Sequence, residues 1–176
     1  MQLVILSGPP GAGKSAAAEA LCERYDRMLH IEMSKLRDFL KMGRLRPWDR
    51  STKANEQLEL FISAACDIAR RFLEAGYGVI IDDVITREEL PIYREALLSQ
   101  EGVHFVVLLP DLDVVLERKG VDPRQRDRLT QLHKGFMEWD SVSVVRPAGL
   151  APALVADRVM ALAGEGASLM STPTGA

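Results

Sequence analysis

One short segment near the start of the chain, Gly8 to Ser15, constrains the fold more than any other feature. It reads Gly-Pro-Pro-Gly-Ala-Gly-Lys-Ser and matches the pattern G-x-x-x-x-G-K-[ST] at every fixed position. The continuous apolar run Leu3 to Leu6 precedes it, as expected for a parallel strand covered on both faces, and the alanine-rich segment 15–25 after it has helical spacing. A strand, a glycine-rich turn and a helix in this order predict a phosphate-binding loop.

The residue types of this segment fit that chemistry. Glycines allow backbone geometries that turn successive N–H groups toward phosphate oxygens, and the helix N-terminus adds a positive partial charge. We expect Lys14 to reach the β- and γ-phosphates of a nucleotide and Ser15 to bind Mg²⁺. The residues expected to line the nucleotide are Gly8, Pro9, Gly11, Ala12, Gly13, Lys14, Ser15 and Ala16.

Short apolar runs alternate with helical patterns along the rest of the chain. Further strands are expected at 28–31, 79–81, 103–109 and 142–145. Further helices are expected at 34–42, 51–75, 86–99, 111–119, 122–139 and 151–163. The alternation predicts a three-layer α/β/α sandwich with a five-stranded, mainly parallel sheet and a short lid. We assign residues 1–163 to this domain, and residues 164–176, mostly Gly, Ala, Ser, Thr and Pro, to a flexible tail.

Composition narrows the class of protein. The chain has 176 residues, 47% of them hydrophobic and 27% charged, which suits one globular domain. The longest apolar runs have about five residues, whereas a membrane span needs about 20. A net charge of −3 argues only mildly against non-specific nucleic-acid binding, and it leaves a local basic patch open. With two cysteines and no signal-peptide pattern, we expect a cytoplasmic monomer or homodimer.

Two adjacent carboxylates follow the apolar strand at 79–81. Ligands of open α/β sheets bind at the carboxyl ends of strands, so Asp82 or Asp83 would hold Mg²⁺ directly or through water. The alternative is a strand-end turn in which an aspartate caps the following loop. Adjacent strand residues point in opposite directions, so at most one of the two faces the site.

The loop Gly8–Ser15, the strand ending Val79–Asp83 and the arginine-rich segment 118–128 resemble P-loop kinases. The resemblance is to the group that contains nucleoside-monophosphate kinases, chloramphenicol phosphotransferase and zeta-toxin-like kinases. It covers residues 1–163, and segment 74–84 is most similar to the chloramphenicol phosphotransferase type. The resemblance implies transfer of the γ-phosphoryl group of Mg-ATP to a small-molecule hydroxyl or phosphate.

Such kinases often carry an aspartate base after the second strand, and this chain has Ser34 at that place. Serine is a poor base, so either Glu32 or Asp83 would act as the base, or the acceptor would react without one. The alternative for Ser34 is a helix N-cap, and for Glu32 a solvated charge. The resemblance also implies that Arg37 binds a phosphate of the acceptor, against the alternative of a surface salt bridge.

Arginines gather where these kinases carry a lid. Arg118, Arg124 and Arg128 would clamp the transferring phosphoryl group, and the alternative is a solvated basic helix face. Trp48, in the loop before the long helix, either lines the acceptor pocket or anchors its loop.

Two other classes of function stay open, the first being a P-loop ATPase that acts as a nucleotide-dependent regulator or switch. A nucleotide-dependent switch that reads guanine would need Asn-Lys-x-Asp, which the sequence lacks. A toxin-like or nucleic-acid end kinase is the third possibility, against which the net charge argues weakly.

Overall fold

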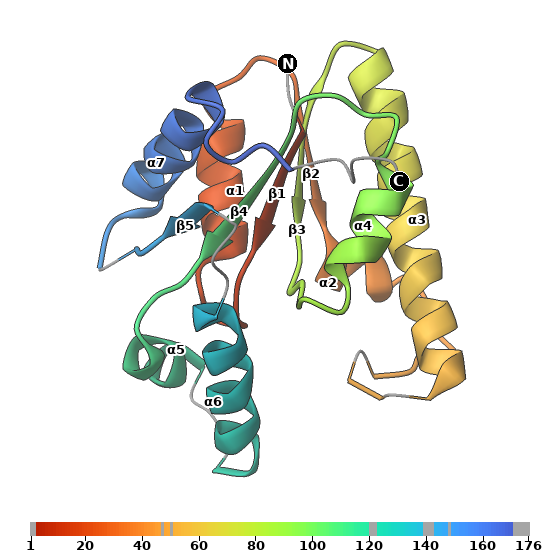
Figure 1. Ribbon diagram of the computed structural model, residues 1–176, viewed down its shortest axis with the longest axis vertical. Helices are drawn as coiled ribbons and strands as arrows, with labels where there is room; N and C mark the ends of the chain where they lie inside the picture. The colour runs from red at the N-terminus through yellow and green to blue at the C-terminus, as the bar shows by residue number, and fades with distance from the viewer. Residues whose placement is uncertain are drawn as a thin grey trace.

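The computed structural model describes residues 3–46, 48–49, 51–119, 123–138, 143–147 and 149–170, without the side chains of residues 118, 119, 123 and 124. Its five strands are β1 (Leu3–Ser7), β2 (Met28–Glu32), β3 (Gly78–Asp82), β4 (Val103–Leu108) and β5 (Ser143–Val145). They form one parallel sheet in the order β2-β3-β1-β4-β5 (Figure 1). The predicted fold class is confirmed.

Helices cover both faces of the sheet, as continuous apolar strands require. On one side lie α1 (Lys14–Cys22) and α7 (Pro152–Gly164), and on the other α3 (Thr52–Glu74) and α4 (Leu90–Ala96) (Figure 1). Successive residues of β1 point to opposite sides, so Leu3 and Ile5 pack toward α3, and Val4 and Leu6 toward α1. None of the described helices is long and apolar enough to cross a bilayer.

Three further helices lie where the strands end. α2 (Met33–Arg37) follows β2, while α5 (Leu112–Lys119) and α6 (Pro123–Met137) follow β4 (Figure 1). The arrangement places residues from four separate segments of the chain around the carboxyl edge of the sheet, beside the glycine-rich loop. This is the edge at which the ligands of parallel α/β sheets bind.

Hydrogen bonds between side chains and the backbone lie at the start of α3 and just before α4. The Ser51 hydroxyl accepts a hydrogen bond from the Ala54 N–H at 3.3 Å and caps the N-terminus of α3. The Thr86 N–H donates to the Glu89 carboxylate at 2.7 Å, in the turn that leads into α4. The helix that follows runs only from Leu90 to Ala96, shorter than the predicted 86–99.

The helix predicted at 34–42 is wrong in its extent, because α2 ends at Arg37. The chain continues in tight turns, in which the Phe39 and Leu40 N–H groups donate to the Leu36 and Arg37 carbonyls three residues earlier. Phe39 and Met42 are 76% and 85% exposed, so a longer helix would have no apolar face to bury there.

The segment after α7 folds back on the sheet. The Phe105 N–H donates to the Ser168 carbonyl at 2.8 Å, and the Met170 N–H to the Val103 carbonyl at 2.8 Å. The first part of the predicted tail is thus held against β4, while residues 171–176 lie outside the described residues. The division at residue 163 stays a prediction.

Candidate active site

The glycine-rich loop connects β1 to α1 in the expected way. Gly8, Gly11 and Gly13 have φ angles of 138°, 88° and 92°, which other residues rarely adopt. A Cβ atom on Gly8 would lie 2.2 Å from the Leu108 carbonyl oxygen, so only glycine fits between the loop and β4.

The first turn of α1 is open to an anion. Its N-cap is Gly13, and no side chain of the described residues caps the helix. The first N–H groups of a helix lack partners within it, so those of Lys14, Ser15 and Ala16 are suited to phosphate oxygens. Lys14 is buried, and its ammonium donates to the Gly8 and Pro9 carbonyls at 3.0 and 3.2 Å. The positive charge of Lys14 therefore lies over the glycine-rich loop itself.

Asp82 faces this loop. Its Oδ1 lies 3.5 Å from the Ser15 hydroxyl, and its Oδ2 lies 2.6 Å from Nε2 of His30 on β2. Asp82 is 4% exposed, and its long contact with Ser15 leaves oxygen lone pairs for a cation. His30 was missed by the sequence reasoning. The available signal was its position two residues before Glu32, on the same face of the adjacent strand.

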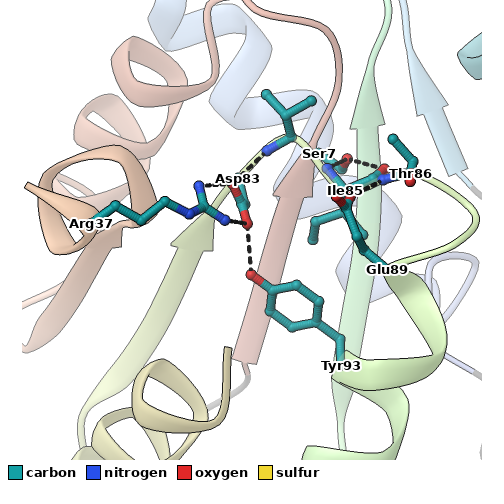
Figure 2. A network of polar contacts seen from close by, with 8 residues as sticks. Ser7, Arg37, Asp83, Ile85, Thr86, Glu89 and Tyr93 are labelled. Atoms are coloured by element: carbon teal, nitrogen blue, oxygen red, sulfur yellow. Dashed lines mark hydrogen bonds and ion pairs between the residues drawn. The ribbon is translucent and has the colours of Figure 1, made fainter. Parts of the chain in front are cut away.

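Asp83 points to the opposite side of the sheet, toward α4, and four donors surround it (Figure 2). Arg37 binds both of its oxygens at 2.7 Å. The Val84 N–H donates to Oδ1 at 2.8 Å, and the Tyr93 hydroxyl donates to Oδ2 at 3.0 Å. A carboxylate has about four lone-pair sites, so all of those on Asp83 are used. Burial raises the pKa of Tyr93 well above its usual value, which keeps its hydroxyl protonated as a donor.

The loop after β3 is tied to β1. The Ser7 hydroxyl donates to the Ile85 carbonyl and accepts from the Ile85 N–H, both at 3.1 Å (Figure 2). Ser7 is fully buried, so this pair fixes where the loop leaves the sheet. Asp83 is thereby held at a set distance from the glycine-rich loop.

Glu32 ends β2 beside Asp82, its register partner on β3. The Ser34 hydroxyl donates to its Oε1 at 2.5 Å, and Lys35 pairs with its Oε2 at 2.8 Å. Partial burial opposes ionisation of Glu32, but the hydrogen bonds from Lys35 and Ser34 outweigh it, so its pKa lies below the ordinary value. The N-cap alternative for Ser34 is wrong. Glu32 occupies the N-cap position, and the Ser34 hydroxyl binds a carboxylate instead of the helix backbone.

The arginines of the predicted lid are described in part. The side chains of Arg118 and Arg124 lie outside the described residues. The Arg128 guanidinium lies 3.7 Å from the centre of the Trp48 ring, so α6 meets the loop before α3. Trp48 remains 53% exposed.

Arg37 also lines a groove beside α3. The lining residues are Arg37, Arg44, Leu45, Arg46, Ala54, Gln57, Leu58 and Phe61. Among these residues, Arg37 pairs with Asp83, and residues 44–46 belong to the loop that leads to Trp48. Arg37 is only 12% exposed and its salt bridge is buried, so the surface salt bridge weighed for it is wrong.

No group of three or more His, Cys, Asp and Glu side chains is arranged to hold a metal ion within the described residues. A divalent ion at Ser15 and Asp82 would therefore complete its oxygen shell with phosphate oxygens and water, as Mg²⁺ commonly does.

Comparison with known proteins agrees with this architecture. A family model described as an AAA domain, AAA_33, matches residues 3–141. No curated protein matches the sequence significantly.

Solved structures share the fold across nearly the whole chain. The tunicamycin resistance protein of Deinococcus radiodurans is 22% identical over 93% of this chain and 95% of its own, with a TM-score of 0.71. Shikimate kinase of Acinetobacter baumannii, solved with shikimate, is 17% identical over 94% of each chain, with a TM-score of 0.66. A sugar kinase from Janibacter is 15% identical over 92% of this chain and 93% of its own, with a TM-score of 0.63.

Proposed function

Because the chain belongs to the AAA_33 family of AAA domains and has the fold of P-loop kinases, we propose that it is an ATP-dependent kinase for a small molecule. It moves the γ-phosphoryl group of Mg-ATP to a hydroxyl or phosphate group of that molecule. The observation that carries the proposal is the open first turn of α1 beneath a buried lysine, with Asp82 facing it.

The donor side is assigned to the glycine-rich loop. The backbone N–H groups of Gly11 and of Gly13 to Ala16 bind the phosphates, while the Ala12 N–H donates to the Pro9 carbonyl within the loop. Lys14 turns from the loop carbonyls to the β- and γ-phosphates. In this transfer the protein contributes mainly position and charge. The arginines of the lid region, Arg118, Arg124 and Arg128, add charge around the transferring group.

Ser15 and Asp82 fit a Mg²⁺ site. Their oxygens lie 3.5 Å apart on the side of β3 that faces the loop, and both are hard oxygen donors. Mg²⁺ bound there would neutralise part of the negative charge on the phosphate oxygens. His30 holds Oδ2 of Asp82 and thereby orients the carboxylate toward Ser15.

We assign the general base, if the acceptor uses one, to Glu32 and not to Asp83. All lone pairs of Asp83 are occupied by buried donors, so it has no site for an incoming proton. Glu32 has donors that can exchange, because Lys35 is 70% exposed. The acceptor then lies beside Ser34, Arg37 and Trp48, and Asp83 acts through Arg37.

A coupled assay of ADP release tests the proposal. Wild type and K14A would be compared over nucleosides, nucleoside monophosphates, sugars and antibiotics, with K134A on the exposed side of α6 as the control. With the right acceptor, wild type and K134A release ADP at least about 10²-fold faster than K14A. If no acceptor raises ADP release by wild type above that by K14A, the chain is not a kinase for these compounds.

A further inference from the structure

The two halves of β4 have different neighbours on the side away from β1. β5 pairs only with the second half, residues 106–108. Beside the first half, residues 103–105, lies the segment after α7, residues 165–170, which we call the C-terminal strap (Figure 1). A strand edge without a partner exposes unpaired N–H and C=O groups, so the strap completes the edge of the sheet there.

Hydrogen bonds from the backbone and from side chains hold the strap on the sheet. The Phe105 and Met170 N–H groups take part in two backbone bonds, and the Ser143 hydroxyl donates to the Ala167 carbonyl at 2.7 Å. A further contact joins Nδ1 of His104 to the Ser168 hydroxyl at 2.9 Å. Only this last contact titrates near neutral pH, because the others use peptide groups and a serine hydroxyl.

His104 is buried on the face of the sheet that α1 and α7 cover. It is 1% exposed, and its register partner on β1 is Val4, which belongs to the apolar cluster on that face. Ser168 is 3% exposed, so the contact between the two side chains is closed to water. Within the described residues, Nε2 of His104 is enclosed and has no hydrogen-bond partner. Most buried polar atoms have one, so this nitrogen is an exception.

A neutral imidazole fits this position, and a charged one does not. The neutral ring carries one N–H and one lone pair, so only one of its nitrogens has a proton to place. The imidazolium carries an N–H on both nitrogens, and the N–H at Nε2 would be buried without an acceptor. Burial lowers the pKa of His104, because it disfavours the charged ring.

Within the described part of the chain, no neighbouring charge offsets this burial. The strands on either side of β4, β1 and β5, carry no titratable side chain. On α1, Lys14 lies at the phosphate-loop end, where it binds the loop carbonyls. The other titratable side chains of α1, α7 and the strap are the partly buried Cys22 and the exposed Glu19, Glu23, Asp157, Arg158 and Glu165. A proton on His104 would therefore be a buried charge without compensation.

We propose that the C-terminal strap is a pH-sensitive latch, which protonation of His104 releases from β4. The inference is independent of the proposed kinase function. In the released state His104 meets water and has its ordinary pKa, about 6.5, so it takes up a proton more readily than in the closed state. The strap is therefore held tightly above about pH 6.5 and loosens as the pH falls below that value. Release uncovers the Phe105 N–H and the Val103 carbonyl, an edge suited to pairing with a strand of another chain.

Amide hydrogen exchange measures release without reference to activity. NMR gives the protection factors of the Phe105 and Met170 N–H groups, corrected for the intrinsic effect of pH on exchange. The Ile81 N–H, in the middle of the sheet, is the internal reference for opening of the whole domain. From about pH 7.5 to about pH 5.5, protection of the two strap amides relative to Ile81 falls several-fold, and about tenfold at most, because release takes up one proton.

Three variants test the part played by His104. Asparagine keeps a polar group near Nδ1 and does not titrate, so in H104N the strap stays closed and the protection ratio no longer depends on pH. S168A removes one hydrogen bond, which lowers the ratio about twofold to tenfold at every pH and leaves its pH dependence in place. H133N is the control, because His133 contacts the Pro110 carbonyl beyond the other end of β4, and it keeps the wild-type pH dependence.

The titration of His104 itself, followed by NMR on the wild type, needs no variant. The pKa of His104 lies below the ordinary value for a histidine, and a pKa at or above that value overturns the latch. A protection ratio that does not change with pH in the wild type also overturns it, as does a change of the same size in H104N.

Discussion

Asp82 and Asp83 are neighbours in sequence, yet the two sides of β3 treat them differently. On the α1 side, Asp82 has one short contact with His30 and a long one, 3.5 Å, with Ser15. On the α4 side, Asp83 has four hydrogen bonds of 2.7–3.0 Å and is enclosed with Arg37 and Tyr93. The Asp82 carboxylate is therefore available for a further ligand, whereas the Asp83 carboxylate is fully used.

The contrast between Asp82 and Asp83 shows that burial alone does not identify a reactive carboxylate. Both aspartates are nearly inaccessible, at 4% and 6% exposure. What separates them is the number of lone pairs already bound by the protein, because a cation or proton needs a free one. This predicts that Asp83 contributes to folding and Asp82 to catalysis, and substitutions can test that division.

Replacing Asp83 should have the largest effect. D83A leaves the Arg37 guanidinium buried without its partner, and loss of one member of a buried ion pair costs about 3–5 kcal/mol of stability. D82A should cost only about 1 kcal/mol, because it removes one short hydrogen bond, to His30, and one long one, to Ser15. Urea unfolding of both variants measures the contrast. Equal losses of stability would show that the two carboxylates are not divided in this way.

The double variant D83L/R37M is the control for that experiment. Replacing both members of a buried pair by apolar residues is often nearly neutral for stability. We expect it to recover most of the stability lost in D83A. A double variant as unstable as D83A would mean that Val84 and Tyr93, and not Arg37, account for the cost.

The next effect concerns catalysis. D82N should lower kcat by about 10²–10³-fold, the usual cost of losing one group that stabilises charge in the transition state. Because the amide binds Mg²⁺ more weakly, D82N should also need more Mg²⁺ for half-maximal activity. A Mg²⁺ titration of kcat measures both. Unchanged Mg²⁺ dependence in a folded D82N protein would remove Asp82 from the metal site.

A smaller effect is expected for Tyr93. Y93F removes one hydrogen bond from Asp83 and leaves Arg37 in place, so it should cost about 1 kcal/mol of stability. The kcat should change less than in D82N, because Tyr93 acts only through Asp83. Thermal unfolding and steady-state kinetics on the same preparation check both. A loss of kcat larger than in D82N would place Tyr93 at the reacting groups.

The sequence predicted the donor side of the site better than the acceptor side, for a physical reason. The phosphate loop is a local structure, and its glycine positions and following helix can be recognised within one segment. The sequence also limited Asp82 and Asp83 to opposite faces, but it could not show which face carried four donors. That depends on Arg37 and Tyr93, and Arg37 is 46 residues away in sequence.

The same reason explains the error over Ser34 and the extent of α2. The local sequence favoured a serine cap and a helix to Met42. In the structure α2 ends at Arg37, the residue that pairs with the distant Asp83. Met42 is left exposed, so no packing extends the helix. The groove beside α3 was missed because its rim is a loop, and loop arginines carry no pattern that distinguishes the rim of a groove from solvated surface.

The smallest effect tests whether Glu32, which lies beside Asp82, is the general base. The pKa of Glu32 lies below the ordinary value for a glutamate. As the pH falls, kcat/KM should therefore stay high down to that ordinary value and decline only at lower pH. S34A removes a donor that stabilises the ionised form, and should move the acid limb slightly toward higher pH. The pH profiles of wild type and S34A, with S63A on the exposed face of α3 as the control, measure the shift. An unmoved acid limb in S34A would assign the limb to another group, and the acceptor would then react without help from Glu32.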